Sequence, residues 1–175
     1  IDGDDWVVSE NMKQLISDLK DENADIILND YINCYEDGSE TRDSYPIESN
    51  KRFSFDEVCT KLKWIQYHGC IYKTNVLKDN NIRLDENCFY VDTEFMAFPI
   101  PYVNTLKYLS YPIYCYRLGL QGQSVSPESR KKNINHSRIV SDSLLSFYQE
   151  QQSSISLEKT KYLSKGISMH CIWYF

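Results

Sequence analysis

The first six residues constrain the fold of this chain most, because they place three carboxylates in four positions. Asp2, Asp4 and Asp5 lie between an apolar first residue and the apolar residues 6–8. Like charges this close repel one another, so such a turn usually has a cation or a basic partner. A buried strand that meets an acidic turn is typical of α/β proteins, in which ligands bind at these turns. The pattern therefore predicts an α/β fold with a ligand site at residues 2–5.

Helix and strand signals alternate along the residues that follow. Apolar side chains at helical spacing predict a helix after Ser9, which can cap its N-terminus. A long strand is predicted at residues 24–35, followed by a hairpin turn at Asp37-Gly38 and a polar edge strand from Ser39 to Tyr45. This alternation predicts a mixed sheet with flanking helices.

The second half of the chain carries further signals of both kinds. A capping box at residues 54–57 opens a helix, and two short strands are predicted at 105–109 and 113–117. Ser126 followed by a proline predicts the start of a long helix, and a last helix is expected from Ser156 to Phe175. We therefore divide the chain into a sheet domain, residues 1–126, and a C-terminal helical extension, residues 127–175.

Composition narrows the classes of function. The chain has 175 residues, of which 42% are hydrophobic, and this is enough for one domain with a core. Its net charge of −6 and its lack of a basic stripe argue against nucleic acid as a partner. The six cysteines form no C-x-x-C pair, so we expect free thiols in a reducing compartment. This predicts a cytoplasmic chain, with the inner face of the membrane as one location.

The acidic turn has three interpretations. Its carboxylate oxygens suit Mg²⁺ or Mn²⁺, with phosphate and water as the other ligands. An EF-hand calcium loop counted from Asp2 needs glycine and glutamate where the chain has Val7 and Lys13, so the calcium loop is excluded. In the third interpretation the turn only caps the next helix. The local residues leave the metal site and the cap equally open.

Two further motifs carry candidate chemistry. Residues 90–95, Y-x-D-x-E-F, set Asp92 and Glu94 between aromatic residues, where one could act as a general base with a raised pKa. The alternative is that Asp92 caps a helix, with Glu94 in its first turn. Arg117 ends a predicted strand before the glycine-containing loop 119–126 and could clamp a phosphate, or could pack its stem on tyrosines.

The order of these motifs resembles that of the bacterial family 2 glycosyltransferases of GT-A fold, which build surface polysaccharides. The matching segments are D-x-D-D-W at 2–6, L-K-x-N-N-I-R at 77–83, Y-x-D-x-E-F at 90–95, and Y-x-Y-R with a later S-x-S within 114–126. The resemblance implies a partial GT-A-like, Rossmann-like mixed sheet. It also implies inverting transfer of a sugar from a nucleotide donor such as a UDP-sugar to a saccharide or lipid-linked acceptor.

The resemblance also implies roles for single residues. Asp2 matches the first aspartate of D-x-D, near the ribose of the donor, and Asp4 matches the second, which holds Mn²⁺ or Mg²⁺ on the diphosphate together with Asp2. Asp92 matches the aspartate that deprotonates the acceptor hydroxyl. Arg117 and Glu94 are expected to bind substrate, Arg117 at the diphosphate.

The chain departs from the family pattern in two places. Val91 stands where the family usually has an acidic residue before the base. In the family a nucleotide-binding half precedes D-x-D, whereas here D-x-D comes first. We therefore expect that half to be missing, the isolated chain to be inactive, and an open sheet edge that can pair with a second copy. The alternative is a non-catalytic interaction domain that keeps a degenerate transferase fold.

Overall fold

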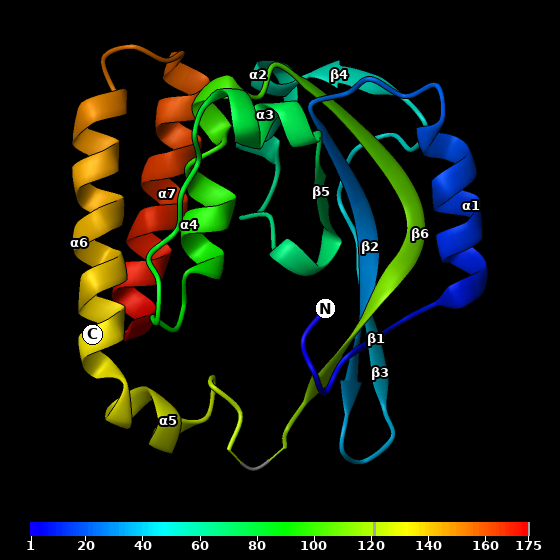
Figure 1. Cartoon of the computed structure of the whole chain (residues 1–175). Coiled ribbons are helices and arrows are strands. Elements are labelled where there is room, and N and C mark those ends of the chain that lie inside the picture. The colour runs from blue at the N-terminus through cyan, green and yellow to red at the C-terminus, as the bar shows by residue number, and fades with distance from the viewer. Residues whose placement is uncertain (121, 175) are drawn as a thin grey trace.

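A curled mixed sheet of six strands, with helices on both faces, is the centre of the described structure (Figure 1). The structure is a computed structural model, and it describes residues 1–120 and 122–174. The predicted end of the last helix, Phe175, lies outside the described residues. In chain order the elements are β1 (Trp6–Val7), α1 (Ser9–Leu19), β2 (Ile26–Tyr35), β3 (Glu40–Asp43), β4 (Arg52–Ser54), α2 (Phe55–Val58), η1 (Cys59–Lys61), η2 (Tyr67–Gly69), β5 (Cys70–Tyr72), α3 (Thr74–Asp79), α4 (Asp92–Ala97), η3 (Ile100–Tyr102), β6 (Thr105–Leu118), α5 (Pro127–Lys132), α6 (Ile134–Gln151) and α7 (Leu157–Tyr174).

The long strands β2 and β6 lie side by side at the middle of the sheet and run parallel. The strand order is β1-β6-β2-β3, with β4 also paired to β6 and β5 also paired to β2. The other pairings are antiparallel. The predicted α/β class and mixed sheet are therefore confirmed. Residues 30–35 of β2 and 112–118 of β6 form the carboxyl ends of the parallel pair, where open α/β sheets bind ligands.

The prediction of two strands at 105–109 and 113–117 was wrong, because both belong to β6. Asn29 pairs with Leu109, but the next residue of β2, Asp30, pairs with Pro112. Proline has no N–H for the ladder, so a strand that contains it pairs irregularly there. The irregularity bends β6 without ending it, and Figure 1 shows the resulting curve.

Three predicted helix boundaries differ from the structure. Ser9 is the first residue of α1 and Val8 occupies the cap position. Asp92 is likewise inside α4, so the interpretation of Asp92 as a helix cap was wrong. The long helix expected after Ser126 is interrupted at Asn133, which separates α5 from α6. Asparagine favours such breaks because its side chain competes for backbone hydrogen bonds.

Other local predictions are confirmed. The capping box forms, with Ser54 and Glu57 bonding each other's backbone at the start of α2. Gly38 has a φ of 81°, a left-handed value that suits glycine in the hairpin turn between β2 and β3. All six cysteines are free thiols, as expected.

Two hydrophobic clusters cover the two faces of the sheet. The smaller one packs Leu15 of α1 against Ile27, Leu109 and Ile113. The larger one packs the opposite face against α2, α4, α6 and α7, and it includes Ile26 and Leu106 from the sheet. Leu144 of α6 and Leu163 of α7 belong to this larger cluster, so the helices beyond residue 126 share a core with the sheet.

Candidate functional site

The acidic turn is held at the carboxyl end of β6 by hydrogen bonds to its carboxylates. Tyr114 donates its hydroxyl to Asp5 Oδ2 over 2.7 Å and accepts the backbone N–H of Asp2 over 3.2 Å. The backbone N–H of Arg117 donates to the other oxygen of Asp5 over 2.8 Å. A turn near the N-terminus is thus fixed to the end of β6.

The two remaining carboxylates of the turn also have neutral partners. Tyr67 of η2 donates its hydroxyl to Asp2 Oδ2 over 2.8 Å. Gln123, in the glycine-containing loop, donates to Asp4 Oδ2 over 3.0 Å and to the carbonyl of Arg117 over 2.8 Å. Among the described residues, none of the three carboxylates forms an ion pair with a lysine or arginine. The negative charge of the turn is therefore uncompensated by a cationic side chain.

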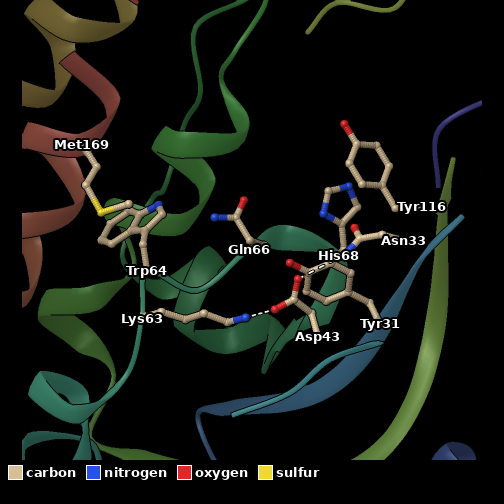
Figure 2. Close-up of a pocket in the computed structure, with 9 residues that line it drawn as sticks. All are labelled: Tyr31, Asn33, Asp43, Lys63, Trp64, Gln66, His68, Tyr116 and Met169. Atoms are coloured by element: carbon tan, nitrogen blue, oxygen red, sulfur yellow. Dashed lines mark hydrogen bonds and ion pairs between the residues drawn. The ribbon is translucent and has the colours of Figure 1, made fainter. Parts of the chain in front are cut away.

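Aromatic rings surround His68 next to this turn (Figure 2). The imidazole stacks on Tyr116 with a centroid distance of 4.0 Å and lies 3.9 Å from the ring of Tyr67. A methyl group at Gly69 would come within 2.4 Å of the carbonyl of Asn29. Only glycine therefore lets η2 pack this closely on β2, and this close contact places His68 against the sheet.

Asp92, from the start of α4, joins the same site. Burial raises the pKa of Asp92, and the negative charge of Asp2 raises it further. Hydrogen bonds from the backbone of residues 92 and 93 lower it, but by less. The charge of Asp2 therefore acts on Asp92, although the two residues are far apart in sequence. The preceding Tyr90 has a φ of 72°, a strained value for a tyrosine, and donates its hydroxyl to the carbonyl of Ser124 over 3.2 Å.

The charges of four aspartates act on the hydroxyl of Tyr116. Burial raises the pKa of its hydroxyl to about 12, and the charges of Asp5, Asp92, Asp2 and Asp4 contribute in that order. The hydroxyl of Tyr116 is therefore neutral and can donate a hydrogen bond at any physiological pH. The arrangement is an acidic site with aromatic walls.

Glu94 does not reach this site. Its side chain is fully buried, and Oε2 accepts the backbone N–H of Asp85 over 2.9 Å. Burial and the nearby carboxyl of Asp85 raise the pKa of Glu94 to about 7. In this conformation Glu94 binds the backbone of Asp85 and has no exposed surface. Its predicted contact with a substrate stays a prediction.

Arg117 is also apart from Asp92, because side chains alternate along β6. Tyr114 and Tyr116 face His68, whereas Arg117 faces the opposite side and lies 5.2 Å above the ring of Trp6. There it lines a separate open pocket of about 600 Å³ beside the β2–β3 hairpin. Its guanidinium does not point at the acidic turn, and only its backbone N–H contacts Asp5.

The residues at the turn match part of what a divalent cation needs. In the described part of the chain, no three His, Cys, Asp or Glu side chains come together as a complete metal site. Asp2 and Asp4 still offer hard oxygen ligands, and Mg²⁺ is usually held by one or two carboxylates plus phosphates and water. The donor set therefore fits a metal that arrives with a diphosphate, rather than one that the protein encloses alone.

Sequence reasoning missed the tyrosines and the histidine of the site. Tyr114 and Tyr116 are two residues apart in a strand, and this spacing places both on one face. That signal was available and was read only as part of the Y-x-Y-R motif. The role of Tyr67, His68 and Gln123 had no such signal, because their positions depend on how η2 and residues 122–126 lie against the sheet.

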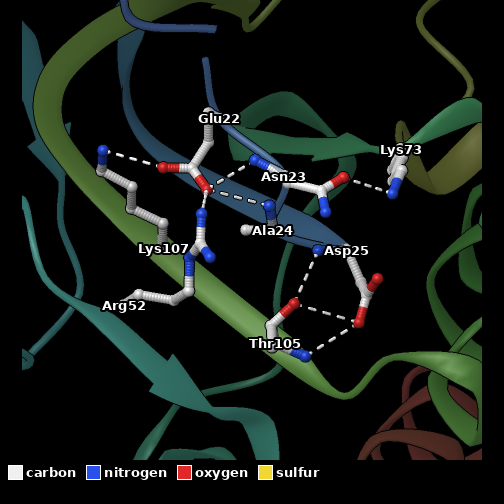
Figure 3. Close-up of polar contacts among 8 residues, drawn as sticks. All are labelled: Glu22, Asn23, Ala24, Asp25, Arg52, Lys73, Thr105 and Lys107. Carbon is white, nitrogen blue, oxygen red and sulfur yellow. Dashed lines mark hydrogen bonds and ion pairs between the residues drawn. The ribbon is translucent and has the colours of Figure 1, made fainter.

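A second polar cluster lies at the opposite, amino end of β2 and β6 (Figure 3). The Glu22 carboxylate accepts from Lys107 over 2.9 Å, from Arg52, and from two backbone N–H groups. Burial would raise the pKa of Glu22, but these hydrogen bonds hold it at about 2. Asp25 accepts from the backbone and side chain of Thr105. This cluster joins β2, β4 and β6 and has a structural role.

Comparison with known proteins assigns no family to this chain. No family model matches the sequence, and no curated protein matches it significantly. Among the helices of the described residues, none combines the length and the apolar character needed to cross a membrane.

Proposed function

We propose that this chain forms the metal and acceptor side of a GT-A-like glycosyltransferase, which moves a sugar from a nucleotide diphosphate to a hydroxyl acceptor with inversion. One observation carries the proposal: the negative charge of Asp2, which Tyr114 holds at the carboxyl ends of the parallel strands, acts on Asp92. Ligands bind at this end in open α/β sheets. The D-x-D turn and the Y-x-D motif are the two motifs to which the sequence resemblance assigns the chemistry.

The residues of the site divide the reaction between them. The bond between C1 of the sugar and the diphosphate oxygen breaks, while the acceptor oxygen forms a bond to C1 from the opposite face. Asp92 would take the proton of the acceptor hydroxyl, and the burial that raises its pKa makes it a stronger base. General-base help of this kind is worth on the order of a hundredfold or more.

Asp2 and Asp4 are the residues that would hold Mn²⁺ or Mg²⁺. When bound, the cation supplies positive charge for the diphosphate that leaves. Tyr67 and Gln123 orient these two carboxylates through their hydrogen bonds. The unpaired negative charge of the turn supports this role, because close carboxylates without a lysine or arginine partner favour a bound cation.

Calorimetric titration of the chain with Mn²⁺, with and without UDP, tests the proposal. We expect Mn²⁺ to bind and UDP to strengthen the binding. Asp4→Asn should weaken Mn²⁺ binding about tenfold or more. Removing a residue that only hydrogen-bonds to a metal ligand can already weaken metal binding about tenfold. The matched control is Asp142→Asn, which removes an exposed aspartate of α6 and should leave the titration unchanged.

Other outcomes contradict the proposal. Mn²⁺ binding that UDP does not strengthen, or no Mn²⁺ binding at all, would favour a non-catalytic interaction domain. Selective binding of Ca²⁺ without nucleotide would favour a calcium module. An equal loss in Asp4→Asn and Asp142→Asn would show that total charge, not the turn, attracts the cation.

A further inference from the structure

The charges of this chain are divided unevenly between its two parts. Residues 127–175, which contain α5, α6 and α7, carry seven lysine and arginine side chains and four acidic ones. Residues 1–126 carry 12 basic and 21 acidic side chains. The helical extension is therefore positively charged, although the whole chain has a net charge of −6. Such an asymmetry favours a partner with a high density of negative charge, such as a membrane or a nucleic acid.

Positive charge gathers where α5 meets α6. The last turn of α5 contains Arg130, Lys131 and Lys132. Arg138 follows in α6, and Glu128 is the only acidic residue between positions 127 and 141. The side chains of Lys131, Lys132 and Arg138 are exposed, and none of them forms an ion pair within the described parts of the chain. Their charge is therefore available to a partner.

Exposed isoleucines accompany these basic residues. Ile134 is 42% exposed and lies one helical turn before Arg138, so the two side chains are neighbours on the surface of α6. Ile139, which follows Arg138 in the chain, is 46% exposed. Single exposed apolar side chains are common on proteins. Beside basic side chains without ion pairs, they give this surface both positive charge and apolar contact area.

The packing of α7 on α6 brings a further isoleucine to this surface. The two helices are joined by residues 152–156 and pack against each other. A connection this short makes neighbouring helices antiparallel, so the end of α7 lies beside the start of α6. Figure 1 shows α5 at the same end of this helix pair. Ile172, near the end of α7, is 78% exposed. The α5 end, as we name this surface, consists of Lys131, Lys132, Ile134, Arg138 and Ile172.

This combination of side chains favours a membrane over a nucleic acid. Anionic lipid headgroups attract lysine and arginine, and the boundary between headgroups and acyl chains accepts apolar side chains. Contacts to the phosphates of a nucleic acid need basic and hydrogen-bonding groups, and they leave exposed isoleucines without a role. An anionic membrane surface therefore matches both properties of the α5 end.

We propose that the α5 end binds the surface of membranes that contain anionic lipids. Lys131, Lys132 and Arg138 contact the headgroups, while Ile134 and Ile172 enter the boundary between headgroups and acyl chains. Each basic side chain near an anionic membrane strengthens binding about fivefold, so three of them predict a preference of roughly a hundredfold for anionic over zwitterionic membranes. This inference does not depend on the proposed function, because it involves none of the residues of the acidic site.

Co-sedimentation of the whole chain with lipid vesicles tests the inference. The vesicles consist either of phosphatidylcholine alone or of equal parts of phosphatidylcholine and the anionic phosphatidylglycerol. We expect the chain to bind the mixed vesicles far more tightly, and added NaCl to weaken this binding by screening. The double substitution Lys131→Glu and Lys132→Glu should weaken binding to the mixed vesicles about thirtyfold or more, because the loss of two positive charges alone accounts for that factor.

The matched control is the double substitution Lys20→Glu and Lys78→Glu. It changes the net charge by the same amount at two exposed lysines, one at the end of α1 and one in α3. Figure 1 shows both helices away from α5. Physiological salt screens exposed charges that are separated by more than about 8 Å. The control should therefore bind the mixed vesicles like the wild type.

A second pair of variants tests the apolar contribution. Ile172→Ser keeps the charge and should weaken binding to the mixed vesicles about tenfold, the factor expected for an isoleucine side chain that is buried in the membrane. Its control is Ile16→Ser, at a 58% exposed isoleucine of α1, and this variant should bind like the wild type. If thermal melting shows that the lysine variant does not fold, this second pair decides alone.

Four results overturn the inference. Equal binding to both kinds of vesicle, or no binding to either, excludes an anionic membrane as the partner. An equal loss in the two double variants assigns the attraction to the total charge of the chain. Unchanged binding of folded Ile172→Ser removes the apolar contact. Binding of a single-stranded DNA oligonucleotide without vesicle binding, abolished by Lys131→Glu and Lys132→Glu, assigns the α5 end to nucleic acid instead.

Discussion

Gly166 of α7 lies against the indole of Trp64. Gly166→Ala therefore tests directly how closely α7 packs on Trp64. The added methyl carbon would lie 1.9 Å from Cε3, 2.1 Å from Cζ3 and 2.4 Å from Cδ2 of Trp64. Carbon atoms in contact are normally about 3.5–4.0 Å apart, so the ring must move by roughly 1.6 Å or more. Figure 2 shows Met169 of the same helix next to the indole of Trp64.

Two opposite effects set the size of the change. Inserting a methyl group into a packed core typically costs about 1–3 kcal/mol. Alanine gains back up to about 1 kcal/mol over glycine inside a helix. We therefore expect Gly166→Ala to lower the free energy of unfolding by about 1–2 kcal/mol and the melting temperature by about 2–8 °C, given the size of the domain.

Urea denaturation followed by circular dichroism measures the change in the free energy of unfolding. The control Ser164→Ala, at an exposed position of the same helix, should change it by less than about 0.5 kcal/mol. Trp64→Phe in the Gly166→Ala background should recover part of the loss, because a smaller ring leaves room for the methyl group. A stabilised Gly166→Ala variant would refute the close contact between α7 and Trp64.

Two further predictions concern charge. Glu22→Gln should destabilise the fold by about 1–2 kcal/mol at neutral pH, a value reduced for the solvent around the half-exposed Arg52. Because the folded-state pKa of Glu22 is lowered from 4.5 to about 2, its stabilisation is lost as pH falls through that range; an unchanged difference from the wild type near pH 3 would contradict this. Asp92→Asn should stabilise the fold at neutral pH, because burial raises the pKa of Asp92 and makes its charge costly. That gain in the free energy of unfolding should vanish below pH 3.8, the ordinary pKa of the group, because the carboxyl is then protonated in both the folded and the unfolded state. Unfolding curves at several pH values measure it, and a gain that persists in acid would contradict the prediction.

The sequence by itself determined the local elements of this protein. The helix at α1, the hairpin turn at Gly38 and the capping box at Ser54 depend on residues within one or two turns of each other, so their signals are readable in the sequence. The α/β class followed from the order of these elements. The acidic turn was also visible, because three carboxylates in four positions need no tertiary context to be unusual.

Only the tertiary structure decided which of the candidate residues meet. The charge of Asp2 acts on Asp92 because α4 contacts η2, whose Tyr67 binds Asp2, whereas Glu94, two residues later, turns into the interior. Arg117 points to the other face of the sheet from Tyr116, because successive side chains of a strand alternate between faces. Pro112 bends β6 at the place where the sequence predicted a break between two strands. Contacts between distant segments depend on packing and on irregular pairing, which local sequence patterns do not encode. The acidic residues were therefore predictable one by one, but their assembly with Tyr116 and His68 was not.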